Sequence, residues 1–186
     1  MRIKTYLIGI LFLLLLLLTI FNISKMVSDG TKELYSVKEI RHIYNDYAAT
    51  FIKKEFPIIN VTNIADTSRH LKTIFKTNTL VILLAKTGCS PCQLRELKNL
   101  AELKKRKNTL NIIAVLNENE RLRALKLKKI AHINFPFYYT FDNNLDVFNK
   151  FKKYPLICLI KGQKVEKCLL PIPIDKQYSL KFYNNF

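Results

Sequence analysis

Two cysteines, Cys89 and Cys92, are separated by two residues in the stretch TLVILLAKTGCSPCQLRELKNL, residues 79–100. An apolar run precedes them, and a charged segment with leucines at helical spacing follows them. The apolar run is typical of a strand buried on both faces, and the leucine spacing is typical of an amphipathic helix. The pair is therefore expected where a central strand gives way to a helix. Two thiols in such a place can bind a metal, form a structural crosslink or exchange with other disulfides.

The start of the expected helix favours a reactive thiolate at Cys89. The N–H groups of a helix's first turn have no partner within the helix, and together with the helix dipole they stabilise negative charge. Pro91 fits this turn because its missing N–H is not needed there. An exposed Cys89 thiolate can attack a substrate disulfide, and Cys92, one turn further along and more buried, can resolve the mixed disulfide. We expect Cys89 to be the nucleophile and Cys92 to be the resolving thiol.

Metal binding and a purely structural crosslink are weaker interpretations of the pair. A tetrahedral zinc site usually has four protein ligands, and one C-x-x-C motif supplies only two of them. The other cysteines, Cys158 and Cys168, lie in a separate expected hairpin, and the three histidines show no paired spacing. A disulfide between Cys89 and Cys92 closes a very short loop, so it would add little stability through chain entropy. We expect no metal and no other bound cofactor.

Alternating strand and helix patterns position the pair. The expected strands are residues 57–64, 79–86, 110–117, 135–141, 156–162 and 164–170. The expected helices are residues 67–77 (a turn or short helix), 90–107, 118–133, 143–153 and 175–186. Strands separated by such helices indicate crossover connections and a mainly parallel sheet, while the last two strands, joined at Gly162-Gln163, form an antiparallel hairpin. The expected fold class is α/β, a three-layer α/β/α sandwich with a mixed sheet.

The arrangement of Cys158 and Cys168 depends on the register of that hairpin. With a two-residue turn, Cys158 pairs with Lys167 and Cys168 pairs with Ile157, which places the two sulfurs on opposite faces of the sheet. A three-residue turn would instead bring the cysteines opposite each other. We expect both to be buried core residues, with a structural disulfide as the alternative.

An uncharged run of 18 residues, Tyr6 to Ile23, stands near the N-terminus. This length is close to the roughly 17–25 residues that span a bilayer. The apolar part of a cleaved signal peptide is usually only about 7–15 residues and ends in a small-residue cleavage site, which this run lacks. We expect residues 1–24 to form a single-pass transmembrane helix that acts as a signal-anchor, residues 25–56 a membrane-proximal helical linker, and residues 57–186 the folded domain. The short basic tail before the run favours a domain on the extracytoplasmic side of the cell membrane.

The formal net charge of +17 at pH 7 raises the question of a nucleic-acid partner. The lysines are scattered along the expected solvent faces of helices, and no nucleic-acid-binding module accompanies them. A basic surface beside an anionic membrane is attracted to the lipid head groups. We therefore expect a lipid bilayer as partner, and no nucleic acid.

The arrangement resembles the thioredoxin superfamily, and within it the membrane-anchored TlpA-like redoxins. The resemblance covers roughly residues 57–183 and rests on CSPC after a buried strand, on the strand order and on YPLICLIKGQKV. In that family the proline before the penultimate strand is cis and packs against the thiol pair, and Pro155 matches that position. The resemblance implies that Tyr154 offers backbone hydrogen bonds to an extended substrate. The other expected substrate contacts surround the cysteines: Gly88, Ser90 and Pro91.

The chain departs from the family pattern at three positions. A tryptophan usually precedes the first cysteine, whereas Gly88 stands there and the chain has no tryptophan. Thioredoxins carry a buried acid where this chain has Leu83. TlpA-like proteins often have a glutamate where this chain has Arg95, and Glu96 follows it. Glu96 is therefore a candidate proton acceptor, and the alternative is an exposed helix carboxylate that pairs with nearby lysines.

The resemblance implies a membrane-anchored, extracytoplasmic thiol–disulfide oxidoreductase that acts on protein thiols and disulfides. It favours a disulfide reductase that receives electrons from a membrane donor of thiols. A peroxidase is disfavoured because Lys86 stands where its signature needs threonine or serine. A non-enzymatic factor for copper or haem-protein assembly is a further alternative, but copper chaperones of this fold prefer C-x-x-x-C. A redox-inert binding module is the last alternative, because the glycine before Cys89 and the missing acid are consistent with loss of activity.

Overall fold

The computed structural model describes residues 2–65, 70–72, 75, 77–117 and 121–186. These residues divide into two compact units, Met1–His42 and Ile43–Phe186. Helix α1 (Arg2–Ala49) makes up the first unit, and its last turns belong to the second. The expected anchor and linker helices are thus one continuous helix, consistent with the absence of proline from this stretch.

Side chains of α1 are described for residues 13–26 and from residue 37 onward. The apolar side chains from Leu13 to Met26 that are described are exposed. Residues 1–12 of the expected anchor lie outside the described side chains. Within the part of the chain that is described, no helix has the length and apolarity that a bilayer span requires. The anchor therefore stays a prediction.

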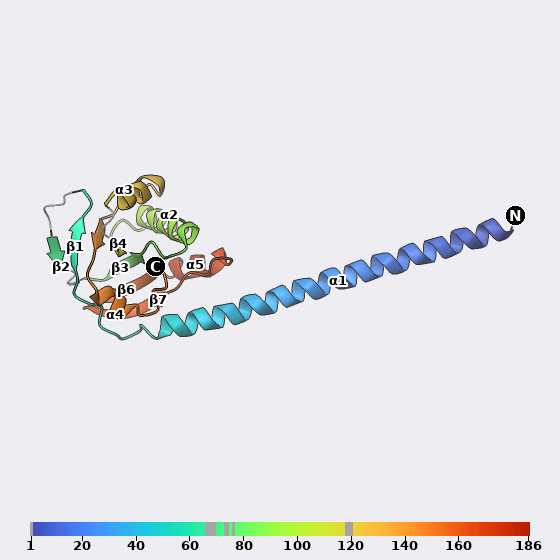
Figure 1. The fold of residues 1–186 in the computed structure, drawn as a ribbon, viewed down its shortest axis with the longest axis horizontal. Coiled ribbons are helices and arrows are strands. Elements are labelled where there is room, and N and C mark those ends of the chain that lie inside the picture. Colours follow the sequence, from blue (N-terminus) through green and yellow to red (C-terminus); the bar gives the residue numbers. More distant parts are fainter. Residues whose placement is uncertain (1, 66–69, 73–74, 76, 118–120) are drawn as a thin grey trace. The chain divides into compact units, whose positions relative to one another are not determined.

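The second unit is built around one mixed sheet. Its strands among the described residues are β1 (Asn60–Asn63), β2 (His70–Lys72), β3 (Thr79–Leu84), β4 (Asn111–Asn117), β5 (Phe137–Thr140), β6 (Leu156–Lys161) and β7 (Lys164–Leu169). Their order is β2-β1-β5-β4-β3-β6-β7 (Figure 1). Strands β3, β4 and β5 run parallel to one another, and the other neighbouring pairs are antiparallel. The mixed sheet is confirmed, but the expectation of a mainly parallel sheet is wrong.

Strand β2 explains much of that difference. The interval 67–77 was expected to hold a helical turn or short helix, but residues 70–72 pair antiparallel with β1. Strand β1 in turn pairs antiparallel with β5, so a second antiparallel element extends the sheet at the edge opposite to β7. Pairing with a neighbouring strand satisfies backbone groups that a short helix would leave open, and this tertiary contact overrides local propensity.

Helices cover both faces of the sheet. They are α2 (Ser90–Arg106), α3 (Arg121–Ile130), α4 (Asn144–Phe148) and α5 (Lys176–Tyr183). One hydrophobic cluster, here the α2-side cluster, joins one sheet face to Leu97 and Leu100 of α2, Ala124 of α3 and Tyr183 of α5. The other, the α4-side cluster, joins the opposite face to Leu145 of α4 and to the segment that follows α1. The three-layer arrangement is confirmed.

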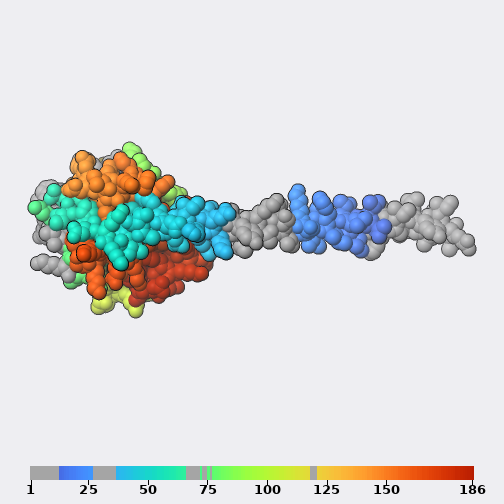
Figure 2. All heavy atoms as spheres, turned by 90° about the horizontal axis from the view of Figure 1, so that it is seen from below, coloured from blue at the N-terminus to red at the C-terminus, as the bar shows by residue number. Residues whose placement is uncertain are grey.

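The segment after α1 lies across the second face. Phe51 packs against Phe148 with ring centroids 5.0 Å apart. The N–H of Lys53 donates to the carbonyl of Val165, and the N–H of Phe56 donates to that of Gln163. Figure 2 shows this segment in teal, between orange and red parts of the chain. Residues 50–56 of the expected linker are therefore part of the folded domain.

The hairpin of β6 and β7 contains an irregularity that changes the expected cysteine placement. Lys161 pairs with Lys164 across the expected two-residue turn. Further along, a register shift leaves Glu166 as an extra residue, so that Cys158 pairs directly with Cys168. The expectation that the two sulfurs lie on opposite faces is therefore wrong. A β-bulge shifts the pairing of the residues beyond it by one position. The three-residue turn considered above would have had the same effect on the two cysteines.

Candidate active site

The Cys89–Cys92 pair lies where the buried strand β3 leads into α2. All six residues of β3 are buried, which explains its continuous apolar sequence. Cys89 is the N-cap of α2, and its Sγ accepts a hydrogen bond from the Cys92 N–H at 3.3 Å. The two sulfurs are bonded at 2.11 Å, with Cα atoms 5.3 Å apart. Pro91 lies in the first turn, as the sequence predicted.

The two cysteines differ in exposure. Cys89 is exposed, as are Ser90 and Pro91, whereas Cys92 is 4% exposed. An incoming sulfur can therefore reach Cys89, while Cys92 is accessible mainly from Cys89. This geometry agrees with the expected division between an attacking and a resolving thiol, although the roles themselves stay predictions.

Gly88 brings the cysteine loop against the loop that carries Pro155. A Cβ added at Gly88 would lie 2.8 Å from the Tyr154 Cβ and 3.1 Å from the Tyr154 carbonyl oxygen. It would also lie 2.4 Å from the Gln93 Nε2. A side chain at this position would therefore force the Tyr154 loop and the Gln93 side chain to shift, which explains why glycine suits the close approach of the two loops.

The Tyr154-Pro155 bond is cis, and both residues are buried. The side-chain amide of Asn117 donates to the Tyr154 hydroxyl at 3.1 Å. Burial raises the pKa of Tyr154, so this hydroxyl remains protonated at neutral pH. Tyr154 thus lies beside Gly88, next to the cis bond to Pro155, and the substrate-binding role of both residues stays a prediction.

Glu96 is fully buried, contrary to the alternative of an exposed carboxylate paired with lysines. Its Oε1 lies 2.7 Å from the Arg95 Nε, and its Oε2 accepts from the Tyr183 hydroxyl at 2.8 Å. It follows Cys92 by four residues, so both side chains lie on one face of α2. Burial and the neighbouring Glu96 carboxylate raise the pKa of Tyr183, which keeps that hydroxyl a donor.

Arg95 has a structural contact that the sequence did not reveal. Its Nη1 donates to the Pro173 carbonyl at 3.0 Å, and its Nη2 donates to the Ile172 carbonyl at 3.1 Å. These bonds attach the segment after β7 to α2, close to the cysteines. No local pattern in the sequence indicates this contact, because its partners lie 78 and 77 residues away.

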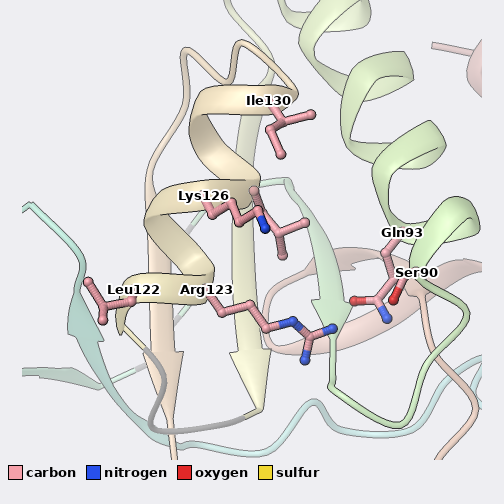
Figure 3. Close-up of a pocket in the computed structure, with 7 residues that line it drawn as sticks. Ser90, Gln93, Leu122, Arg123, Lys126 and Ile130 are labelled. Carbon is pink, nitrogen blue, oxygen red and sulfur yellow. The ribbon is translucent and has the colours of Figure 1, made fainter.

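Two grooves flank the disulfide. The first has a volume of about 550 Å³, and its lining includes Cys89, Cys92, Lys98, Pro173 and Lys176. The second has a volume of about 460 Å³ and lies between α2 and α3. Its lining includes Ser90, Gln93, Arg123, Lys126 and Ile130 (Figure 3). Each groove therefore combines apolar surface with two or more polar or basic side chains beside the pair.

Gln93, which sequence reasoning missed, links the second groove to the cysteine loop. Its side-chain nitrogen donates to the Ala85 carbonyl at 2.7 Å, and the Arg123 guanidinium approaches the same carbonyl at 3.4 Å. In Figure 3 the Gln93 and Arg123 side chains extend toward each other from α2 and α3. The Gln93 Oε1 is buried and has no hydrogen-bond partner among the residues that the structure describes. This acceptor can serve a donor that enters the groove.

The described residues contain no group of three or more histidine, cysteine, aspartate or glutamate side chains able to hold a metal ion. The chemistry that the site itself offers is the thiol–disulfide couple of Cys89 and Cys92.

No protein-family model and no curated protein matches the sequence. Solved structures match the fold. A secreted Mycobacterium tuberculosis disulfide oxidoreductase homologous to Escherichia coli DsbE is 9% identical, with a TM-score of 0.53 over 67% of this chain and 92% of that chain. The thioredoxin domain of a Bacteroides vulgatus thiol–disulfide oxidoreductase is 15% identical, with a TM-score of 0.53 over 72% and 98%.

StoA from Bacillus subtilis is also similar, at 15% identity and a TM-score of 0.50 over 69% of this chain and 96% of that chain. At these identities the likeness concerns the fold. The second unit has the mixed, thioredoxin-like α/β fold found in these proteins, and it carries the pair Cys89 and Cys92 at the start of α2.

Proposed function

We propose that the protein is a thiol–disulfide oxidoreductase that acts on protein substrates through Cys89 and Cys92. The observation that carries the proposal is the asymmetry of the pair. An exposed Cys89 caps α2 and accepts the Cys92 N–H, while Cys92 is buried behind it. A fold shared with oxidoreductases of known structure supports the same conclusion.

In the reducing direction, the Cys89 thiolate attacks one sulfur of a substrate disulfide. A Cys89–substrate disulfide forms, and the other substrate sulfur leaves as a thiolate and takes up a proton. The Cys92 thiol then loses its proton and attacks the Cys89 sulfur, which forms the 89–92 disulfide and releases the second substrate thiol. Two electrons pass to the substrate, and the first-turn N–H groups stabilise the Cys89 sulfur whenever it is a thiolate.

Glu96 is the candidate acceptor for the Cys92 proton. Its carboxylate lies one turn along the same face of α2, in the protein interior. Arg95 holds its Oε1, and the Tyr183 hydroxyl and the Asn99 side-chain amide donate to its Oε2. In thioredoxins, which the chain resembles, a buried acid stands at the position of Leu83 in β3. Glu96 would take over the role of that acid from α2.

Polypeptides with extended, partly acidic segments fit the surroundings of the pair. The Tyr154 backbone lies beside Gly88. Hydrogen bonds from this backbone to an extended substrate, which the resemblance to the thioredoxin superfamily implies, are part of the proposal. Lys98 and Lys176 line one groove, and Lys126 lines the other. Basic side chains attract acidic segments over roughly a Debye length, about 8–10 Å at physiological ionic strength.

We further propose that the enzyme is anchored in the cell membrane, with its domain on the extracytoplasmic side, and that it is a reductase supplied by a membrane donor of thiols. The uncharged run from Tyr6 to Ile23 and the basic tail before it support this arrangement. The likeness to a secreted oxidoreductase is consistent with it. Labelling of Cys89 in intact cells by a membrane-impermeant thiol reagent tests the location, with membrane extraction at alkaline pH as the test of anchoring.

The reduction potential of the 89–92 couple tests the reaction and its direction. The full-length chain is equilibrated with dithiothreitol or glutathione mixtures, its thiols are trapped by alkylation, and the peptide with both cysteines is followed by mass spectrometry. A reversible two-electron couple near or below about −250 mV supports a reductase, and one near about −120 mV would make the protein an oxidant. If no 89–92 disulfide forms at any potential, the proposed function is wrong.

A further inference from the structure

Two free cysteines face each other across the hairpin of β6 and β7, away from the site described above. Cys158 and Cys168 are paired residues in the two strands, and their sulfurs are 3.4 Å apart. A disulfide bond is about 2.05 Å long, so the sulfurs need to approach by only about 1.4 Å. Figure 1 shows β6 and β7 side by side at one edge of the sheet.

The facing arrangement is produced by the β-bulge at Glu166. Ile160 pairs with Val165, but Leu159 pairs with Lys167, so one residue of β7 has no partner in β6. Without this extra residue Cys158 would face Lys167, and the two sulfurs would lie on opposite faces. The bulge therefore brings two thiols together that a regular two-residue hairpin would separate.

The two thiols differ in exposure, as the first pair does. Cys158 is fully buried in the α4-side cluster, and Cys168 is half-buried at its margin. Burial and the neighbouring Cys168 raise the pKa of the Cys158 thiol, which keeps Cys158 protonated at neutral pH. Cys168 is the sulfur that a solvent molecule can reach first.

The first pair cannot supply the oxidant directly. Helix α2, which carries Cys92, packs on the α2-side cluster, whereas Cys158 belongs to the cluster on the opposite face of the sheet. The sheet separates the two pairs. An oxidant for Cys158 and Cys168 must therefore reach them from solvent.

We propose that Cys158 and Cys168 form a second redox pair, which closes to a disulfide across the hairpin by exchange with a low-molecular-weight disulfide such as oxidised glutathione. The Cys168 thiolate attacks the glutathione disulfide and releases one glutathione thiolate. The Cys158 thiol then loses its proton and displaces the second glutathione from Cys168. Two thiols become one protein disulfide, and the two electrons and two protons appear in two molecules of reduced glutathione.

The closed form would fix β7 covalently to β6. Strand β7 is the edge strand, and residues 53–56 of the segment after α1 bond to its first half and to the turn before it. The disulfide thus ties the second half of the edge strand to the sheet, where that segment does not reach.

The test uses the full-length chain with Cys89→Ser and Cys92→Ser, which removes the first pair. The protein is equilibrated with mixtures of oxidised and reduced glutathione, alkylated under denaturing conditions and digested with trypsin. Trypsin cuts after Lys161, Lys164 and Lys167, so only a disulfide keeps Cys158 and Cys168 in one species. We expect a crosslinked species lighter by two hydrogen atoms than the sum of its peptides, reversible with dithiothreitol, and a higher denaturant midpoint for the oxidised protein.

The variant Cys158→Ala provides the matched control. It should stop at a glutathione adduct on Cys168, because the resolving thiol is absent. Full alkylation of both cysteines in the most oxidising mixture, or a stable glutathione adduct on Cys168 with Cys158 still present, would overturn the proposal. The same experiment on the wild-type chain, read at the 158–168 peptides, guards against a folding defect of the double-serine variant. The outcome does not depend on whether Cys89 and Cys92 are active.

Discussion

Cys89 and Cys92 meet at the N-terminus of a helix, whereas Cys158 and Cys168 meet across two strands. The sulfur of Cys89 receives a backbone hydrogen bond, and Cys89 lines a groove that also contains Lys98 and Lys176. The sulfur of Cys158 lies in an apolar core, with another thiol as its neighbour. The same side chain is therefore placed where a thiolate is stabilised in one case and where a thiol is retained in the other.

The difference shows that spacing alone does not decide what a cysteine pair does. The first pair is three residues apart in sequence and the second is ten. Closing the longer loop restricts the unfolded chain more, so the second disulfide should contribute more to stability. The pair Cys89 and Cys92 lies beside a helix N–H group and basic side chains, which favour exchange with a substrate. We expect the first pair to serve turnover and the second to serve the stability of the hairpin.

Replacement of the more exposed sulfur in each pair should give the largest contrast. Cys89→Ser should lower the rate of substrate-disulfide reduction to background, a loss of roughly 10³-fold or more, because the mixed disulfide can no longer form. Cys168→Ser should leave the rate within about twofold, because the sheet separates it from the reacting sulfur. Reduction of a protein disulfide, followed by turbidity or fluorescence, measures both.

The comparison would fail in either of two ways. Residual activity in Cys89→Ser would mean that another thiol attacks the substrate. A large loss in Cys168→Ser with an unchanged denaturant midpoint would mean that the hairpin pair takes part in turnover.

Gly88→Ala should give a smaller effect that belongs to the first pair alone. The added Cβ would lie 2.8 Å from the Tyr154 Cβ, so the cysteine loop and the Tyr154 loop must separate. Such overpacking usually costs about 1–3 kcal/mol in the free energy of unfolding. Displacement of Tyr154 should also lower kcat/KM by roughly 10- to 100-fold. Urea unfolding and steady-state kinetics measure the two effects.

Gln93→Ala combined with Gly88→Ala separates the two contacts of the new methyl group. It removes the Gln93 nitrogen, which would lie 2.4 Å from that methyl group, and leaves the Tyr154 contact. If Tyr154 is the decisive neighbour, the double variant should regain little of the lost kcat/KM. A full recovery of kcat/KM would assign the effect to Gln93 instead.

The sequence was sufficient where one segment determines the structure. The buried strand β3 and the helix after it follow from an apolar run and a leucine spacing. The expected place of Pro155 came instead from the resemblance to the thioredoxin superfamily. The sequence was insufficient where the pairing of one segment with another decides the structure. Strand β2 exists because β1 lies beside it, and Cys158 faces Cys168 because of a bulge at Glu166, which no local pattern indicates.

Glu96 illustrates the same limit within the candidate site. Its position on α2 was predictable from the helical spacing, but its burial was not. The carboxylate is covered because α5 brings Tyr183 against α2 from 87 residues away, and Arg95 crosses to the segment after β7. Only the packed fold distinguishes this buried carboxylate from one exposed on a helix surface.

Tyr183→Phe should have the smallest effect, and this effect should depend on pH. Loss of the hydroxyl removes the 2.8 Å hydrogen bond to Glu96, which should lower the free energy of unfolding by about 1–2 kcal/mol near pH 8. The pKa of Tyr183 is raised in the folded protein above its ordinary value of 10.0. Between these two values the folded state binds more protons than the unfolded state, so the wild type loses stability as pH rises above 10.

The Tyr183→Phe variant has no hydroxyl to titrate. The difference in the free energy of unfolding between the wild type and this variant should therefore shrink between about pH 8 and pH 11. Urea unfolding at several pH values measures the difference.

Glu96→Gln offers the matched comparison, because the Glu96 carboxylate is part of what raises the pKa of Tyr183. Its loss should weaken the pH dependence that Tyr183 causes while leaving the part that burial causes. A difference between the wild type and Tyr183→Phe that stays constant with pH would show that the hydroxyl is not held protonated beside a carboxylate. The hydrogen bond between Tyr183 and the buried Glu96, which has no counterpart beside Cys158, would then contribute no pH-dependent stability.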